Sequence, residues 1–341
     1  MRLPNIHPKK VYASRRPRAV RALTLLTLAC ALGTPLPAAT YELNGAAGAL
    51  IGAPATDIAQ PEDTLLDVAR RNGLGYEEIT RANPGVDTWL PGAGRELVLP
   101  TQRLIPEVER TGIVINLPEH RLYYFPKAER GARPVLITYP ISIGRMDWTT
   151  PLGVTQVVAK NRNPIWYPPK AVLEEHEANG DPLPTFVPPG PDNPLGAFAM
   201  RLGIRGGAYL IHGTNKPAGV GMQVTHGCMR LYPEDIEALF ALVPLHTQVR
   251  IINQPVKLSW IGEELYMEAH QPLDRMGDPQ EPDLKILEGM LLGATADRPV
   301  AINWDAAEET LRKAQGIPTV VAIEVVTEVD FPLPWNGWAQ P

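Results

Sequence analysis

The stretch Thr225-His226-Gly227-Cys228-Met229-Arg230, together with the preceding His212, decides how the rest of this chain is interpreted. The chain has two cysteines in 341 residues, and the other one, Cys30, lies in a segment that resembles an export signal. Exported proteins reach an oxidising compartment, where cysteines pair as disulfides. A single remaining cysteine, with two histidines and a glycine close by, therefore indicates a thiol that is kept for covalent chemistry.

The first 39 residues have the pattern of a secretory signal. Basic residues between Lys9 and Arg21 precede a short apolar run over residues 22–32, and small residues lead up to Ala39. The run is too short to span a bilayer comfortably, so a cleaved signal peptide over residues 1–39 and a periplasmic location are predicted. One alternative is a lipoprotein site that leaves Cys30 acylated. Another is a partial twin-arginine signal at residues 14–16.

The composition describes a mature protein of several parts without affinity for nucleic acid. The net charge is −5, and no long basic run follows the signal, so nucleic acid is not an expected partner. The length predicts two or three domains. The 37 prolines imply many turns and edge positions and argue against a mainly helical protein.

Residues 57–100 predict a small βααβ module. A short capped helix is expected after Thr64, a second over 76–83 and a strand over 97–100. The order resembles a LysM module, and the matching residues are Asp63-Thr64-Leu65, Ile79, Asn83-Pro84 and Leu97-Val98-Leu99-Pro100. The resemblance implies binding to the glycan of peptidoglycan, although Glu62 stands where that family usually has glycine. A spacer without a ligand is the alternative.

Residues 110–255 predict a domain rich in β-strands. A hairpin and four further strands are expected at residues 112–117 with 121–125, 135–143, 154–159, 209–211 and 249–252. A helix is predicted to begin at Pro233, because proline suits a first turn and the acids after it suit the positive helix end. Its apolar residues recur at helical spacing and should pack on the sheet, so the helix is assigned no chemistry.

A proline-rich insertion interrupts this domain. Residues 164–194 contain nine prolines and therefore cannot form a long helix or a central strand. Trp166, Tyr167 and Phe186 argue against a disordered linker, since large aromatic side chains pack against something. We predict a semi-rigid lid over the active site, with Trp166 and Tyr167 facing the substrate.

The residues around Cys228 predict nucleophilic catalysis. A cysteine attacks carbonyl groups as the thiolate, so it needs a base or a positive neighbour, and His212 and His226 can supply both. If residues 225–228 are extended, positions two apart share a face, and His226 lies beside Cys228. The loop over residues 213–221 would then bring His212 to face the sulfur.

Gly227 and Arg230 add to this constellation. Gly227 leaves room for substrate, and its N–H group and that of Cys228 are candidate oxyanion donors. Arg230 would hold an anionic substrate group or shape the cysteine loop. Taken singly, the cysteine and the histidines can also be inert structural residues. Two histidines and a cysteine can also bind zinc, but no second cysteine supports a metal site.

Together, the residues around His212 and Cys228 resemble the pattern of a family, the L,D-transpeptidases with a YkuD-type catalytic domain. The pattern comprises His212-Gly213-Thr214, Thr225-His226-Gly227-Cys228-Met229-Arg230-Leu231, Trp148-Thr149-Thr150-Pro151, the stretch 190–196 and Pro233-Glu234-Asp235-Ile236. Arg230 departs from the asparagine that many members carry. The resemblance implies a β-rich catalytic domain with a flanking helix, and it covers roughly residues 110–275.

The resemblance also implies a reaction. Cys228 would attack the bond between a diamino acid and the terminal D-alanine of a stem tetrapeptide, and an amine acceptor would resolve the acyl-enzyme. His212 would be the base, oriented by the carbonyl of Gly213 or Thr214, and His226 would support the cysteine loop. No metal and no cofactor are implied.

The implied partners are peptidoglycan stem peptides and glycan, and a monomer is expected. The acceptor is either another stem peptide or the C-terminal lysine of an outer-membrane lipoprotein. An L,D-carboxypeptidase, in which water resolves the acyl-enzyme, is one alternative. A non-catalytic wall-binding protein, with the LysM-like module as its functional part, is the other.

Residues 275–341 predict a small α/β extension of unassigned role, with a helix over 306–314 and a strand over 319–326. The predicted fold class is therefore mainly β. A small βααβ module precedes a β-rich catalytic domain with a flanking helix, and an α/β appendage follows it.

Overall fold

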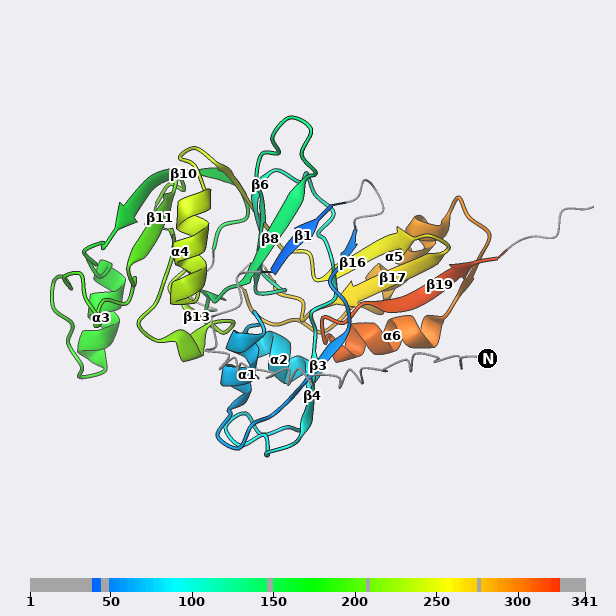
Figure 1. Cartoon of the computed structure of the whole chain (residues 1–341), viewed down its shortest axis with the longest axis horizontal. Helices are drawn as coiled ribbons and strands as arrows, with labels where there is room; N and C mark the ends of the chain where they lie inside the picture. The colour runs from blue at the N-terminus through cyan, green and yellow to red at the C-terminus, as the bar shows by residue number, and fades with distance from the viewer. Residues whose placement is uncertain (1–38, 44–48, 146–149, 207–208, 275–276, 326–341) are drawn as a thin grey trace, which may run out of the picture. The chain divides into compact units, whose positions relative to one another are not determined.

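The computed structural model describes residues 39–43, 49–145, 150–206, 209–274 and 277–325 (Figure 1). Apart from Ala39, the predicted signal peptide lies outside the described residues. The same holds for Cys30, Trp148 and Thr149. Among the residues that are described, no helix is long and apolar enough to cross a membrane. The export signal and its two alternatives therefore stay predictions.

A mixed sheet of nine strands forms the framework of the catalytic domain, in the order β1-β8-β7-β6-β15-β10-β11-β12-β14 (Figure 1). Neighbouring strands run antiparallel except for two parallel pairs, β6 with β15 and β12 with β14. The strands are β1 (Ala39–Glu42), β6 (Gly112–Asn116), β7 (Arg121–Phe125), β8 (Val135–Pro140), β10 (Gly153–Arg162), β11 (Phe198–Leu202), β12 (Leu210–His212), β14 (Met229–Arg230) and β15 (Gln248–Ile252). The predicted hairpin is confirmed as β6–β7, whereas β1, β11 and β14 were not predicted.

Helix α4 (Pro233–Leu242) packs on this sheet, as its apolar spacing predicted. Ile236 and Leu239 are buried in one cluster with strand residues such as Phe198, Met200 and Ile211. Pro233 occupies the first turn, followed by two acids. At the other end, the ammonium group of Lys160 donates to the carbonyl groups of Phe240 and Val243, which have no partner within the helix. The helix thus serves the core.

The N-terminal module consists of β3 (Ala55–Ile58), α1 (Leu65–Arg71), α2 (Tyr76–Ala82) and β4 (Glu96–Leu99), with β3 and β4 paired antiparallel. Thr64 and Asp67 form a reciprocal capping box at the start of α1. The Asn83 side chain donates to the carbonyl of Val98 at 2.8 Å and accepts from the Val98 N–H at 2.8 Å. Asn83 therefore ties α2 to β4, which gives the Asn83-Pro84 match a structural role.

Two short strand pairs lie outside the nine-stranded sheet and the N-terminal module. β2 (Leu50–Ile51) pairs antiparallel with β5 (Arg103–Leu104). β9 (Ile143–Gly144) pairs parallel with β13 (Gln223–Thr225). The second pair matters for the site, because β13 leads directly into the cysteine loop.

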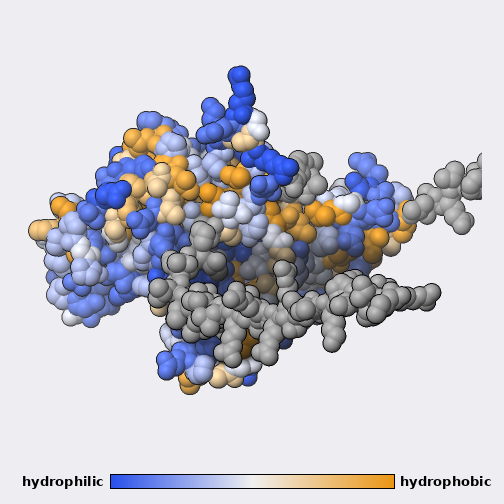
Figure 2. All heavy atoms as spheres, viewed as in Figure 1, coloured by the Kyte–Doolittle hydropathy of each residue, from blue (hydrophilic) through white to orange (hydrophobic). Residues whose placement is uncertain are grey.

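The C-terminal α/β part begins before residue 275, which corrects the predicted boundary. The hairpin of β16 (Val256–Ile261) and β17 (Glu264–Ala269) belongs to a four-stranded sheet, β16-β17-β19-β18. Its other elements are β18 (Val300–Ile302), β19 (Thr319–Glu324), α5 (Leu284–Thr295) and α6 (Trp304–Lys313). Helix α6 and strand β19 match the prediction, and α5 was missed. Figure 2 shows hydrophobic residues gathered over this part of the chain.

Candidate active site

Two parallel strands bring the predicted catalytic segments together. His212 ends β12, Arg230 ends β14, and these two residues are direct partners in the register. Cys228 immediately precedes β14, two residues before Arg230. All three line a cavity of about 290 Å³. The structure therefore places His212, Cys228 and Arg230 at one site.

His212 is buried and neutral. Its Nδ1 lies 2.6 Å from the carbonyl oxygen of Gly213. A carbonyl only accepts hydrogen bonds, so Nδ1 carries the proton and Nε2 is left as the basic nitrogen. Burial lowers the pKa of His212 to about 3, and the charge of Arg230 acts in the same direction against the carbonyl groups of Gly213 and Leu195. At neutral pH the imidazole of His212 therefore stays unprotonated until negative charge develops beside it during the reaction.

Cys228 is held as a neutral thiol. Burial raises the pKa of its thiol to about 11, although the backbone of Leu210 and the charge of Arg230 oppose the rise. With the pKa of His212 at about 3, the proton stays on sulfur until a substrate binds. The site therefore suits general-base activation during attack rather than a thiolate formed in advance.

The carbonyl of Gly213, and not that of Thr214, contacts His212. Thr214 is buried, and its hydroxyl accepts from the backbone N–H of Lys216 at 2.9 Å. The N–H of Gly213 in turn donates to the carbonyl of Phe198 at 3.1 Å. Gly213 is therefore fixed by β11, and it holds the imidazole.

The cysteine loop bends, which corrects the expected extended conformation of residues 225–228. β13 ends at Thr225, and Gly227 has φ +88°, a left-handed conformation that favours glycine. The hydroxyl of Thr150 donates to the Gly227 carbonyl at 3.0 Å, and that of Thr225 donates to the Cys228 carbonyl at 2.5 Å. In a trans peptide the Cys228 N–H points opposite to the Gly227 carbonyl, so it points away from Thr150.

The proline-rich insertion forms one wall of the cavity. Trp166 and Tyr167 line the same cavity as Cys228. Trp166 pairs with Val187 across the insertion, and the ring of Tyr167 lies 6.3 Å from that of Phe186. The insertion also contains α3 (Lys170–Ala178), which was not predicted. This helix fits between the prolines because it is only nine residues long and starts directly after Pro169.

Helix α3 connects the insertion to the cysteine loop through Glu175. Its carboxylate accepts from Arg145 at 2.6 Å and lies 3.1 Å from Nε2 of His226. The hydrogen bonds from Arg145 and His226 hold the pKa of Glu175 at about 2. His226 therefore contacts the wall of the cavity. Sequence reasoning missed Glu175 and Arg145, since nothing in their spacing relates them to residue 226.

The described residues contain one cluster that could suit a metal ion, and it lies elsewhere. Glu119, Glu268 and His270 converge there. The ammonium of Lys257 already fills its centre, 2.9 Å from Glu119, 2.7 Å from Glu268 and 2.6 Å from the Leu104 carbonyl. The zinc alternative requires His212, His226 and Cys228 to converge, and these three residues do not form such a group.

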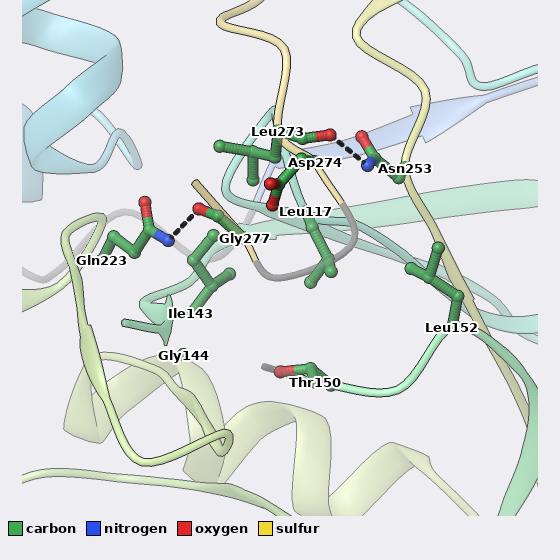
Figure 3. Close-up of a pocket in the computed structure, with 10 residues that line it drawn as sticks. All are labelled: Leu117, Ile143, Gly144, Thr150, Leu152, Gln223, Asn253, Leu273, Asp274 and Gly277. Carbon is green, nitrogen blue, oxygen red and sulfur yellow. Dashed lines mark hydrogen bonds between the residues drawn. The ribbon is translucent and has the colours of Figure 1, made fainter. Parts of the chain in front are cut away.

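Figure 3 shows a second, smaller hollow, which is separate from the cavity that contains Cys228. It is lined by Thr150, which holds the Gly227 carbonyl, and by Gln223 and Asn253. The latter two donate to the carbonyl groups of Gly277 and Leu273, each at 2.7 Å (Figure 3). Its volume of about 30 Å³ suits a water molecule and excludes a peptide. Of the residues that line this hollow, Thr150 therefore supports the cysteine loop.

Comparisons with known proteins find a catalytic domain in the part of the chain that contains His212 and Cys228. The family model described as the YkuD L,D-transpeptidase catalytic domain matches residues 110–251. The chain is 42% identical over 272 residues to the probable L,D-transpeptidase YcfS of Escherichia coli (strain K12), covering 77% of this chain and 83% of that protein.

Two further relatives match over most of their length. The chain is 38% identical over 291 residues to the probable L,D-transpeptidase ErfK/SrfK of Salmonella typhimurium (strain LT2), covering 84% of this chain and 92% of that protein. It is 36% identical over 316 residues to the probable L,D-transpeptidase ErfK/SrfK of Escherichia coli (strain K12), covering 89% and 97%. With its cysteine, its histidine and its β-rich domain in place, this chain belongs to the L,D-transpeptidase family with a YkuD catalytic domain.

Proposed function

We propose that this chain is a periplasmic L,D-transpeptidase that uses Cys228 to transfer the acyl group of a peptidoglycan stem tetrapeptide to an amine. The observation that carries the proposal is the arrangement of the two reacting side chains. Cys228 and His212 share one cavity, and the Gly213 carbonyl holds Nδ1 of His212 so that Nε2 is free to act as a base.

The first half of the reaction forms a thioester. The sulfur of Cys228 attacks the carbonyl carbon between the diamino acid and the terminal D-alanine, and its proton moves to Nε2 of His212. The C–N bond then breaks as His212 returns the proton to the amine of the leaving D-alanine. The Gly213 carbonyl stabilises the imidazolium that forms in between, as the third member of other triads does.

The second half resolves the thioester. An acceptor amine loses a proton to His212 and attacks the thioester carbonyl, and the thiol is regenerated. The acceptor is either the side-chain amine of another stem peptide or the C-terminal lysine of an outer-membrane lipoprotein. Both acceptors present a primary amine, so the chemistry at Cys228 is the same for each.

Arg230 is proposed to bind an anionic group of the stem peptide. It lines the cavity beside Cys228, where its guanidinium carries a permanent positive charge. Stem peptides carry carboxylates, which suit the planar fork of arginine.

The N-terminal module is proposed to bind glycan through its exposed loop after α2. Trp89 and Leu90 are 61% and 80% exposed, which is unusual for adjacent large apolar residues. The side chain of Asp87 accepts from the N–H groups of both residues at 2.8 Å, so the loop has a fixed shape. The substitution Trp89→Ala should weaken sedimentation with insoluble peptidoglycan and leave turnover of small soluble muropeptides unchanged.

Incubation of the mature protein with disaccharide-tetrapeptides tests the reaction. Mass spectrometry of the products should show cross-linked dimers and released D-alanine. Tripeptides without dimers would favour the L,D-carboxypeptidase alternative. Unchanged substrate would favour the non-catalytic wall-binding alternative. Addition of a peptide that ends in lysine then tests the lipoprotein acceptor by competition with the stem peptide.

A further inference from the structure

The turn between α1 and α2 packs against the loop that precedes the cysteine segment. This loop, residues 217–222, begins with a short 3₁₀ turn at Pro217–Gly219 and leads into β13. The N–H of Tyr76 donates to the carbonyl of Val220 at 3.0 Å, and that of Glu77 donates to the carbonyl of Gly221 at 3.3 Å. The first N–H groups of a helix lack partners within it, so the catalytic domain satisfies the start of α2.

Two glycines allow this close approach. A methyl group at Gly221 would lie 2.5 Å from the Cα of Gly75, and one at Gly75 would lie 2.8 Å from the Cα of Gly221. Both distances are too short for real carbon atoms. Gly221 also has φ +87°, whereas Gly75 has φ −101° and needs glycine only for space. The contact is therefore backbone against backbone, and a single side chain disrupts it.

Buried charges fix the module in this position. The Glu78 carboxylate lies 2.7 Å from Arg121 of β7 and 2.9 Å from Arg103 of β5, and all three side chains are at most 8% exposed. Arg121 also donates to the Gly73 carbonyl at 3.0 Å. Separation of the module from the catalytic domain would leave Arg121 without its buried carboxylate partner, which is strongly unfavourable.

The rim of the contact involves α4, which follows the cysteine segment. Arg70 forms two hydrogen bonds with the Glu234 carboxylate, each at 2.8 Å. The Tyr232 hydroxyl donates to the Leu74 carbonyl at 3.1 Å. The module thus contacts the chain both before and after Cys228.

The same loop also touches the residues of the site. The Ser142 hydroxyl donates to the Gly219 carbonyl at 2.7 Å, and Ser142 pairs with Arg230. A methyl group at Gly219 would lie 3.7 Å from a terminal nitrogen of Arg230. A displacement of the loop would therefore reach Arg230 directly and Cys228 through β13.

We propose that the N-terminal module is a positioning part of the active site, in which Gly75 and Gly221 hold the loop that places Arg230 and Cys228. The inference rests on Cys228 being the nucleophile. It differs from a tether, which would raise the local concentration of substrate without altering the catalytic loop. Gly75 and Gly221 are positioning residues, since neither lines the cavity.

The test compares four glycine substitutions in the full mature chain. Gly75→Ala and Gly221→Ala introduce a methyl group into the contact. The controls are Gly206→Ala, with φ +86°, and Gly94→Ala of the module, with φ +77°. Chain neighbours aside, no atom of the described residues lies within 4 Å of the added methyl group at either control position. The controls therefore reproduce the backbone strain of a left-handed alanine without the contact.

The readouts are the rate at which a carbapenem acylates Cys228, the turnover of a soluble tetrapeptide without glycan, and the thermal unfolding midpoint. Gly75→Ala and Gly221→Ala should lower acylation and turnover about 10- to 100-fold, as small misplacements of reacting groups do. In these variants the pH below which acylation slows should be higher. The reason is that Arg230 moves away from His212, so the pKa of His212 rises. The controls should retain the wild-type rate and profile.

The outcomes separate this inference from the proposed function. Wild-type protein that forms no adduct at Cys228 would refute the proposed function. A Cys228 adduct that forms at equal rates in wild type, Gly75→Ala and Gly221→Ala would refute the positioning role. If both glycine variants fail to fold, Arg70→Ala at the half-exposed rim gives the same comparison. A rate below that of the wild type and of the two control variants supports the inference, and an unchanged rate contradicts it.

Discussion

His212 and Arg230 are direct partners across the parallel strands β12 and β14. This places a permanent positive charge beside a buried imidazole. Burial and this charge hold the pKa of His212 at about 3, so the ring is neutral and able to act as a base at any physiological pH.

Arg230→Gln should therefore move the acid limb of the pH profile to higher pH. His212 must be neutral to accept the thiol proton, so activity falls as the pH falls through the pKa of His212. Loss of the Arg230 charge raises that pKa, and the limb follows. The measurement is the pH dependence of the second-order rate of carbapenem acylation, which reports groups of the free enzyme.

Stability must be followed at each pH in this experiment. The pKa of His212 is lower in the folded protein than in the unfolded chain. Between about pH 6.5 and pH 3 the unfolded state binds a proton that the folded state does not, so stability decreases as the pH falls. An acid limb that stays in place in the folded variant would contradict the role given to Arg230.

His212→Ala should lower the acylation rate by about 10²–10⁴, the usual contribution of a positioned base. His226→Ala should have a smaller effect, because His226 contacts Glu175 of the insertion rather than the Gly213 carbonyl. Stopped-flow measurement of β-lactam acylation compares the two variants. If His226→Ala has the larger effect, the two roles are reversed.

Alkylation of Cys228 by a small reagent such as iodoacetamide should accelerate continuously from pH 6 to pH 10. The thiol has a pKa of about 11, and only the thiolate reacts. Mass spectrometry of the alkylated protein follows the rate. A plateau between pH 5 and pH 8 would indicate a thiolate–imidazolium pair formed in advance, contrary to the neutral pair described above.

Glu175→Ala should shift the products from cross-linked dimer toward hydrolysed tripeptide. The carboxylate connects α3 to Arg145 and His226, and an open wall admits water to the thioester. Glu174→Ala is the matched control, since Glu174 lies on the same helix and, among the described residues, its ion pair is with the exposed Lys170. Chromatography of the muropeptides gives the ratio. Equal ratios in the two variants would make the insertion a surface loop without influence on the outcome.

The sequence allowed prediction of those parts of the fold that local patterns determine. The hairpin β6–β7, helix α4 and the two helices of the module follow from alternation, helical spacing and caps, which act over a few residues. The grouping of His212 with Cys228 followed from a motif whose spacing is specific. These features need no knowledge of distant partners.

The remaining features depend on pairings between distant residues. The hairpin of β16 and β17 joins a sheet whose central partner, β19, begins at residue 319. The Glu78–Arg121 pair joins residues 43 positions apart, and the His226–Glu175 pair joins residues 51 positions apart. A charged residue that will be buried against a distant partner has the same sequence signal as one exposed to solvent, so these contacts could not be predicted.

Cys228 carries the acyl group during the transfer, and the mass of the intact protein reports this intermediate. Wild-type protein mixed with a disaccharide-tetrapeptide and quenched in acid should gain the mass of the substrate minus D-alanine. Peptide mapping should locate this mass on Cys228, and Cys228→Ala should show neither the adduct nor any product while remaining folded. An adduct at another residue, or product formation by Cys228→Ala at the wild-type rate, would contradict the account.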